Sequence, residues 1–339
     1  MIVDLHTHVL SARLPHLAAE TGDPRWPRVV PETDGPEVGE VRLGDDVFRV
    51  VRRPFWDTAA RVADMARHGV DAQVVSPIPV AITYWAEGAE ALRFARAQND
   101  EIAEMVAASG GRLLGLGTVP LQDPDLAVAE LARVRGELGL AGVEIGTVVG
   151  RRELDHPSLR PFFRAAAEGG VPLFVHPIDG SGVLRCSSPL VDFGLGMHAD
   201  SALAATALVY GGVLRELGDL RVCLSHGGGS FPWAHPRLAL LRAKERAALD
   251  EDVARLWADC LVFDAQHLPL LVARYGAGHV VLGSDYPFIP PSVHDPRAPL
   301  AEAVELGLVS EADAARVRGA NALDFLGSAE ARALVTHLL

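Results

Sequence analysis

The sequence has few cysteines, and their spacing excludes two classes of protein. Its three cysteines, Cys186, Cys223 and Cys260, lie far apart and outside any CxxC spacing. This pattern is typical of reduced core thiols and not of a disulfide framework or a zinc knuckle. We therefore expect all three cysteines to be buried and reduced, as in a cytoplasmic protein.

Long apolar runs are absent, and positive charge is scarce. No stretch reaches the eighteen apolar residues of a membrane span, and the first strand-like segment already begins at Ile2, which leaves no room for a signal peptide. The 31 basic and 44 acidic residues give a formal net charge of -13, which repels nucleic-acid backbones and anionic membranes. We therefore expect neither a nucleic acid nor a membrane as a partner. A small anionic substrate remains compatible, because a few arginines inside a cleft can reverse the local field.

Short apolar, β-branched runs alternate with amphipathic segments, which predicts βα units and a parallel sheet. The expected strands span residues 2–5, 72–76, 113–118, 142–146, 172–175, 221–224, 260–263 and 280–283. Helical spacing covers residues 58–67, 89–108, 126–137, 159–168, 202–216, 236–249 and 268–275, and continues beyond residue 300. Eight strands with crossover helices favour an α/β fold, a (β/α)8 TIM barrel, with residues 1–339 in a single domain.

Residues 11–57 interrupt this regular spacing. They are rich in Pro, Gly and charge and too long for an ordinary βα loop, which indicates an insertion after the first strand. Within it, residues 40–43 and 47–51 flank Gly-Asp-Asp and predict a β-hairpin. Such a hairpin would carry Arg49 over the mouth of the barrel.

Residues that can bind a metal ion stand at the ends of four predicted strands. The first strand ends in His6-Thr-His8, and two residues of spacing point both imidazoles the same way. His176, His226 and Asp285 each follow a later apolar run, at the barrel face where active sites lie. Imidazoles with a carboxylate suit Zn²⁺, or a similar ion such as Mn²⁺, with a coordination position left open for catalysis.

Several segments together resemble the amidohydrolase superfamily, and within it the metal-dependent, non-oxidative decarboxylases. The chain is most similar to the family of 2-amino-3-carboxymuconate-6-semialdehyde decarboxylases. The resemblance covers almost the whole chain and includes Asp-Leu-His-Thr-His at 4–8, Val-Phe-Arg-Val-Val at 47–51, Tyr-Trp at 84–85, Val-His-Pro at 175–177, His-Gly-Gly-Gly-Ser-Phe at 226–231 and Gly-Ser-Asp-Tyr-Pro-Phe at 283–288.

This resemblance implies a set of roles. The residues that match the family's metal ligands are His6, His8, His176 and Asp285. His226 matches the catalytic acid/base, which would act together with Asp285; its alternatives are a fifth ligand or a structural hydrogen bonder. Arg49 and Arg237 match carboxylate binders, and Arg237 would reach in from a neighbouring subunit of a homodimer. Solvated surface arginines are the alternative for both.

The implied activity is the release of CO₂ from an unsaturated or aromatic carboxylic acid. A mononuclear hydrolase or hydratase, and a barrel that only binds, are the alternatives. The fourth strand has no lysine to carry a carbamate, so we expect no binuclear centre. Glu144 stands there where the family has Gln, and it is either a salt-bridged structural residue or a contact of substrate or metal.

The pocket wall departs from the family's pattern. Residues 178–198 differ from the corresponding stretch of the family, so the acid that is decarboxylated is expected to differ as well. Trp85 and Phe288 either line the pocket or are plain packing. His198, His235 and His267 have no converging partner in the sequence and are expected to be structural.

Overall fold

Eight parallel strands form a barrel, which is closed by hydrogen bonds between its first and last strands. The computed structural model describes residues 1–33, 37–180, 182–328 and 331. The strands, in the order in which neighbours pair, are β1 (Val3–Val9), β5 (Ala72–Pro77), β6 (Leu113–Gly117), β7 (Gly142–Gly146), β10 (Leu173–His176), β11 (Val222–Leu224), β12 (Trp257–Asp259) and β13 (Val280–Val281). Closure comes from backbone bonds between Leu5 N and Leu282 O (2.9 Å) and between His8 N and Tyr286 O (2.7 Å). The predicted TIM barrel is confirmed.

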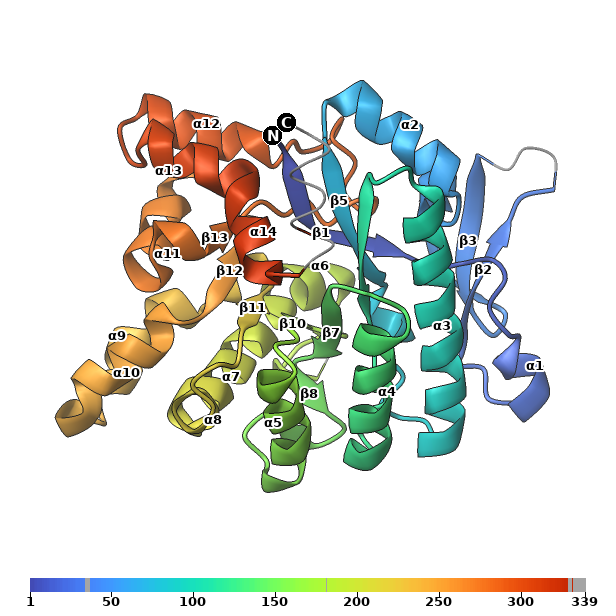
Figure 1. The fold of residues 1–339 in the computed structure, drawn as a ribbon, viewed down its shortest axis with the longest axis horizontal. Coiled ribbons are helices and arrows are strands. Elements are labelled where there is room, and N and C mark those ends of the chain that lie inside the picture. The colour runs from blue at the N-terminus through green and yellow to red at the C-terminus, as the bar shows by residue number, and fades with distance from the viewer. Residues whose placement is uncertain (34–36, 181, 329–330, 332–339) are drawn as a thin grey trace.

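Helices surround the barrel in the order expected of βα units (Figure 1). Those that follow the strands are α2 (Thr58–His68), α3 (Gly88–Ala108), α4 (Pro124–Gly136), α5 (Arg160–Glu168), α7 (Met197–Tyr210), α8 (Val213–Glu216), α9 (Phe231–Leu240), α10 (Arg246–Ala254), α11 (Leu268–Tyr275), α12 (Arg297–Glu305), α13 (Glu311–Ala315) and α14 (Asn321–Leu326). Local sequence fixes several boundaries. Asp57 and Asp123 accept bonds from backbone N–H groups in the first turns of α2 and α4.

Three predicted segments differ from the structure. The seventh strand is not residues 260–263 but Trp257–Asp259, because apolar residues stand on both sides of Asp259 and the pattern does not decide which side forms the strand. The helices predicted at 202–216 and 236–249 are each divided in two, the first at Gly212, whose φ of 77° favours glycine. Cys223 and Cys260 are buried as expected, whereas Cys186 is exposed, because it lies in the loop after β10 and not in the core.

The barrel is plugged at the end where its strands begin. Val3 and Leu5 of β1 and Phe174 of β10 belong to one buried cluster with residues of α14. The rings of Trp257, at the start of β12, and Phe325 in α14 lie 5.5 Å apart. Because this end is filled with apolar side chains, a polar site can form only at the opposite, carboxyl end of the strands.

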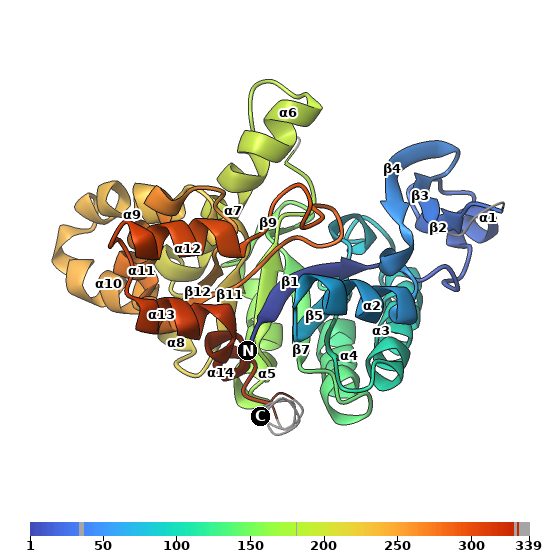
Figure 2. The same ribbon diagram turned by 90° about the horizontal axis from the view of Figure 1, so that it is seen from above.

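The insertion after β1 forms a small antiparallel sheet of its own. It consists of β2 (Pro27–Pro31), β3 (Val38–Leu43) and β4 (Asp46–Arg52), so the segment has one strand more than the hairpin predicted. Figure 2 shows β4 and α6 (Pro189–Val191) projecting from the barrel on the same side, opposite the chain's N-terminus. The two projections therefore flank the mouth at which the strands end.

No helix among the described residues combines the length and the apolar character that a membrane span requires. The cytoplasmic location and the single-domain organisation inferred from the sequence stay predictions.

Candidate metal centre

The structure brings four predicted ligand residues together at the mouth of the barrel. His6 and His8 lie in β1, His176 ends β10, and Asp285 follows β13. One ligand atom from each residue lies within 4.8 Å of all the others. His8 Nε2 is 3.1 Å from His6 Nε2 and 3.2 Å from an Asp285 oxygen, and the three imidazoles are buried. The expected convergence of distant strands is present.

Hydrogen bonds orient all three imidazoles in the same way. The Nδ1 atoms of His6, His8 and His176 lie 2.7, 2.9 and 2.7 Å from Asp259 Oδ2, Pro77 O and Pro177 O. Because carbonyl and carboxylate oxygens only accept, each Nδ1 carries a proton, and each Nε2 is the nitrogen that remains for an ion.

The donor set fits a cation. His176 Nε2 is buried and has no hydrogen-bond partner among the described residues. Three imidazole nitrogens and a carboxylate oxygen converge in one space, which is the arrangement that binds a divalent cation when the imidazoles give up their Nε2 protons. The residues present therefore suit a divalent ion with imidazole and carboxylate ligands.

Asp259 is a component of the site that the sequence interpretation missed. It ends β12, is fully buried, and accepts the Nδ1 proton of His6. It also accepts bonds from the backbone N–H groups of His226 and Gly227, both at 3.0 Å. The run Leu-Trp-Ala-Asp at 256–259 is an apolar stretch that ends in a carboxylate, and it could have revealed Asp259. The predicted strand at 260–263 began one residue too late to show this.

The carboxylates favour positive charge at this site. Burial alone would lower the pKa of His6, but the hydrogen bond and charge of Asp259 outweigh it and raise that pKa to about 9. Burial opposes ionisation of Asp285 too, yet its hydrogen bond to His8 and the nearby imidazoles keep its pKa below the ordinary value. Asp285 thus remains anionic at neutral pH.

His226 lies beside the four predicted ligand residues without belonging to the group they form. Its ring centroid is 5.2 Å from that of His6 and 4.9 Å from that of His176. His226 and Asp285 adopt left-handed φ angles of 54° and 59°, which non-glycine residues rarely do. The backbone bond from His226 to Asp259 holds it there. Burial and the charge of His6 lower its pKa to about 4.

A cavity of about 370 Å³ lies between the two projections. Arg49, Trp85 and Phe288 line it, together with residues of the altered segment 178–198. The ring of Phe288 is 5.7 Å from the ring of His8, so the cavity adjoins the ligand cluster. The Arg49 guanidinium lies 4.9 Å from the Phe288 ring centroid and 5.2 Å from that of Phe193.

Within a single chain, Arg237 does not lie at this site. It lies on the exposed side of α9 and does not line the cavity. Trp233 and Leu240 in the same helix, and Leu241 directly after it, are 82%, 72% and 84% exposed. An arginine among large exposed apolar side chains is typical of an interface residue and not of a solvated surface.

Glu144 is enclosed in the barrel below the ligands. Its Oε2 is 3.9 Å from His8 Nδ1, and neither carboxylate oxygen has a hydrogen-bond partner among the described residues. Burial raises its pKa above the ordinary value. The ionisable group beside it is thus the imidazole of His8, a proposed ligand, and not the arginine or lysine that a structural salt bridge would use.

His198 lies near His226, contrary to the expectation that it has no converging partner. The sequence offered it no converging partner, yet its ring centroid lies 6.0 Å from that of His226. It stands at the start of α7, directly after a π-helical turn at Asp192–Gly196. The altered segment thus adds an imidazole beside the site, which strand-end reasoning could not find because His198 lies on a helix.

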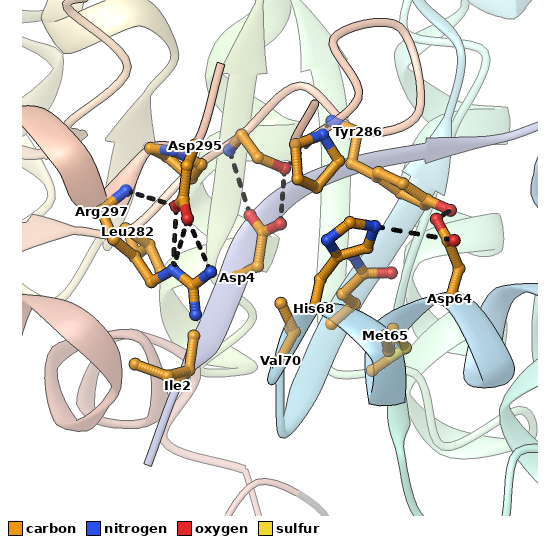
Figure 3. A pocket seen from close by; sticks show the side chains of 14 residues that line it. Ile2, Asp4, Asp64, Met65, His68, Val70, Leu282, Tyr286, Asp295 and Arg297 are labelled. Carbon is orange, nitrogen blue, oxygen red and sulfur yellow. Dashed lines mark hydrogen bonds and ion pairs between the residues drawn. The ribbon is translucent and has the colours of Figure 1, made fainter. Parts of the chain in front are cut away.

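A second, small pocket of about 20 Å³ supports the site from outside the ligand cluster (Figure 3). In it, Asp4 accepts hydrogen bonds from the backbone N–H and the hydroxyl of Ser284, at 3.1 and 2.5 Å. The hydroxyl of Tyr286 donates to Asp64 at 2.6 Å. These bonds fix the residues on both sides of Asp285, so the pocket anchors a ligand loop.

Comparison with known proteins agrees with this geometry. The family model described as Amidohydrolase matches residues 3–328. A 2-amino-3-carboxymuconate-6-semialdehyde decarboxylase of Dictyostelium discoideum is 34% identical, in an alignment that covers 96% of this chain and 91% of that protein. A 2-keto-4-carboxy-3-hexenedioate hydratase of a Sphingobium strain is 26% identical, covering 84% of this chain and 83% of the hydratase.

Two solved structures share the fold. The IDCase of Metarhizium anisopliae superposes with a TM-score of 0.79 at 24% identity, covering 96% of this chain and 97% of its own. A dihydroxybenzoic acid decarboxylase from Polaromonas, solved with manganese and 2-nitroresorcinol, has a TM-score of 0.71 at 22% identity, with 96% of each chain covered.

Proposed function

The chain belongs to the amidohydrolase family, and from that premise we propose that it is a metal-dependent, non-oxidative decarboxylase. The observation that carries the proposal is the convergence of three oriented imidazoles and one carboxylate within 4.8 Å, beside a non-ligand histidine. The decarboxylase from Dictyostelium, similar over nearly the full length, supports the reaction class. The proposed substrate is an unsaturated or aromatic carboxylic acid.

The proposed ion is Zn²⁺, held by His6, His8, His176 and Asp285. Imidazole nitrogens suit zinc, whereas manganese prefers sites richer in oxygen ligands. Mn²⁺ is the competing candidate, because the Polaromonas decarboxylase was solved with manganese. When bound, a divalent ion supplies Lewis acidity that stabilises negative charge next to it.

The protein's own side chains have separate tasks. Arg49 presents a forked guanidinium to the cavity and makes no ion pair with any described residue, so it is available to a substrate carboxylate. His226 delivers the proton to the carbon from which CO₂ departs. Trp85 and Phe288 supply apolar surface that holds the body of the acid and excludes water.

The cavity is large enough for a substituted ring or an equivalent chain. Its volume of about 370 Å³ exceeds the roughly 150 Å³ of a cavity that accommodates benzene. Residues of the segment 178–198 form one wall. Because this wall departs from the family's pattern, we propose that the preferred acid differs from that of the Dictyostelium relative.

We propose that the active form is a homodimer in which Arg237 reaches the neighbouring site. The support is the exposed apolar side of α9 around Arg237, which a second copy of the chain would cover. Trp and Arg are the residue types enriched at the centres of such interfaces. Two arginines, one from each subunit, suit a substrate with two carboxylate groups.

The decisive experiment measures metal content and CO₂ together. Purified protein is analysed for metal, stripped with a chelator and reloaded with Zn²⁺ or Mn²⁺. It is then offered 2-amino-3-carboxymuconate-6-semialdehyde, 2,6-dihydroxybenzoate and 5-carboxyvanillate. We expect CO₂ release from at least one acid, lost on stripping and restored by one of the ions. Metal-loaded protein that releases no CO₂ from any of them would refute the proposal.

A hydratase is the second candidate, because the Sphingobium hydratase matches 84% of this chain. The same site could add water to an unsaturated acid. With 2-keto-4-carboxy-3-hexenedioate as substrate, consumption of the double bond without CO₂ release would favour the hydratase over the decarboxylase.

A further inference from the structure

Every turnover of the proposed decarboxylation consumes one proton, so the inference that follows rests on that proposed function. The carbon–carbon bond breaks, CO₂ leaves, and the electron pair left on the carbon takes up a proton (RCO₂⁻ + H⁺ → RH + CO₂). His226, the proposed donor, is only 8% exposed. It must therefore regain a proton from solution through a neighbouring group.

The imidazoles on one side of His226 cannot supply this proton. His6 and His176 have their Nδ1 protons committed to Asp259 and to Pro177 O, and their Nε2 atoms face the proposed ion. His198 differs from both. Its ring centroid lies 6.0 Å from that of His226, within the span of one bridging water molecule, and it is only partly buried.

The backbone around His198 is packed so closely that its position is built into the fold. Its carbonyl accepts a bond from Ser230 N at 3.2 Å, in the loop that carries His226. A Cβ on Gly229 would lie 2.1 Å from that carbonyl oxygen, and one on Gly196 would lie 2.2 Å from Gly180 O. Only glycine permits these approaches, which hold the start of α7 against both site loops.

The groups that face His198 suit a proton carrier. Burial lowers its pKa below the ordinary value, the charge of Asp259 acts in the opposite direction, and His267 lowers it slightly further. At neutral pH the imidazole is therefore mainly neutral, and a neutral imidazole can accept a proton at one nitrogen and donate from the other.

We propose that His198 is a positioning residue that relays protons from solution to His226. A proton from the solvent binds one nitrogen of His198, and the proton on the other nitrogen passes through a water molecule to His226. His226 is then ready to protonate the next carbon, and His198 returns to its neutral form.

The test is His198→Asn, which keeps a polar side chain that cannot titrate. It uses the metal-loaded enzyme in dilute buffer, with whichever of 2,6-dihydroxybenzoate, 5-carboxyvanillate or 2-amino-3-carboxymuconate-6-semialdehyde the wild type decarboxylates. We expect kcat to fall by roughly 10- to 100-fold with KM unchanged, since general acid–base assistance has this scale or more. Added imidazole should restore kcat, and the effect of D₂O on kcat should increase.

His294→Asn is the matched control. His294 is also a partly buried histidine near the barrel mouth, but its ring contacts Phe263 at 4.7 Å and not His226. It should keep its kcat and show no response to imidazole. A His198→Asn enzyme with normal kcat, or with a loss that imidazole does not restore, would overturn the relay. Failure of the proposed function is a different result, in which the wild type itself releases no CO₂.

Discussion

At the scale of single residues, the site includes carboxylates outside the group of proposed ligands. Asp259 holds the proton on His6 Nδ1 and the backbone N–H groups of His226 and Gly227. Removing such an outer partner weakens metal binding, because the ligand loses its orientation and part of its basicity. One buried carboxylate thus links the ligand set to the proposed acid.

Asp259→Asn should lower the affinity for Zn²⁺ by about 10- to 100-fold. The measurement is competition with a chromogenic chelator at constant pH. Asp264→Asn is the control, since Asp264 is exposed and only caps the turn at Gln266. Equal affinities of the two variants would mean that Asp259 does not tune the ligand.

Glu144 and Glu130 are both buried, but their surroundings differ, so each serves as a control for the other. Glu130 accepts bonds from Arg96, Asn99 and Arg133, whereas the Glu144 oxygens have no hydrogen-bond partner among the described residues. In metal-free protein, Glu144→Gln should raise the free energy of unfolding by about 1–2 kcal/mol, because a neutral amide replaces a buried carboxyl group whose ionisation burial disfavours. Glu130→Gln should lower it by roughly 2–3 kcal/mol.

Thermal and denaturant unfolding of both variants check the two signs. Zinc affinity should also fall in Glu144→Gln, because the carboxylate lies 3.9 Å from His8 and contributes negative charge to the ligand shell. A Glu144→Gln protein that is less stable than wild type would show that the carboxylate has an essential partner.

At the scale of secondary-structure elements, most strand ends were predictable, and positions inside loops and helices were not. His6, His8, His176 and Asp285 could be found because each follows an apolar run, and parallel strands of a barrel end at one face. Asp259 also ends a strand but was missed, because apolar residues on both sides of it left the position of this short strand undetermined. His198 lies on a helix whose packing depends on glycine contacts distant in the sequence.

The antiparallel sheet of the insertion acts as an element that carries Arg49 to the cavity. Arg49→Lys keeps the charge but loses the planar fork, so KM should rise by about tenfold with a smaller change in kcat. Steady-state kinetics with the acid identified above measure both. Arg42→Lys, on the neighbouring strand and paired with Glu40, is the control and should leave KM unchanged.

At the scale of the whole molecule, the barrel and its insertion could be predicted from local sequence patterns. The association of subunits could not. The exposure of Trp233, Leu240 and Leu241 appears only once α9 is placed on the barrel, because the sequence alone does not show which side of a helix remains uncovered. The expectation that Arg237 acts across an interface came from resemblance alone. The structure adds the surface on which such an interface could form.

Mixing two inactive variants tests the shared site directly. Arg237→Ala keeps its own His226 but cannot supply the arginine, and His226→Asn can supply the arginine but cannot protonate carbon. If subunits exchange at random, half of the dimers are mixed and one of their two sites is complete, so about a quarter of wild-type turnover should return. Light scattering should show a dimer that Trp233→Glu dissociates. A mixture no more active than the sum of its parts would mean that each subunit works with its own residues.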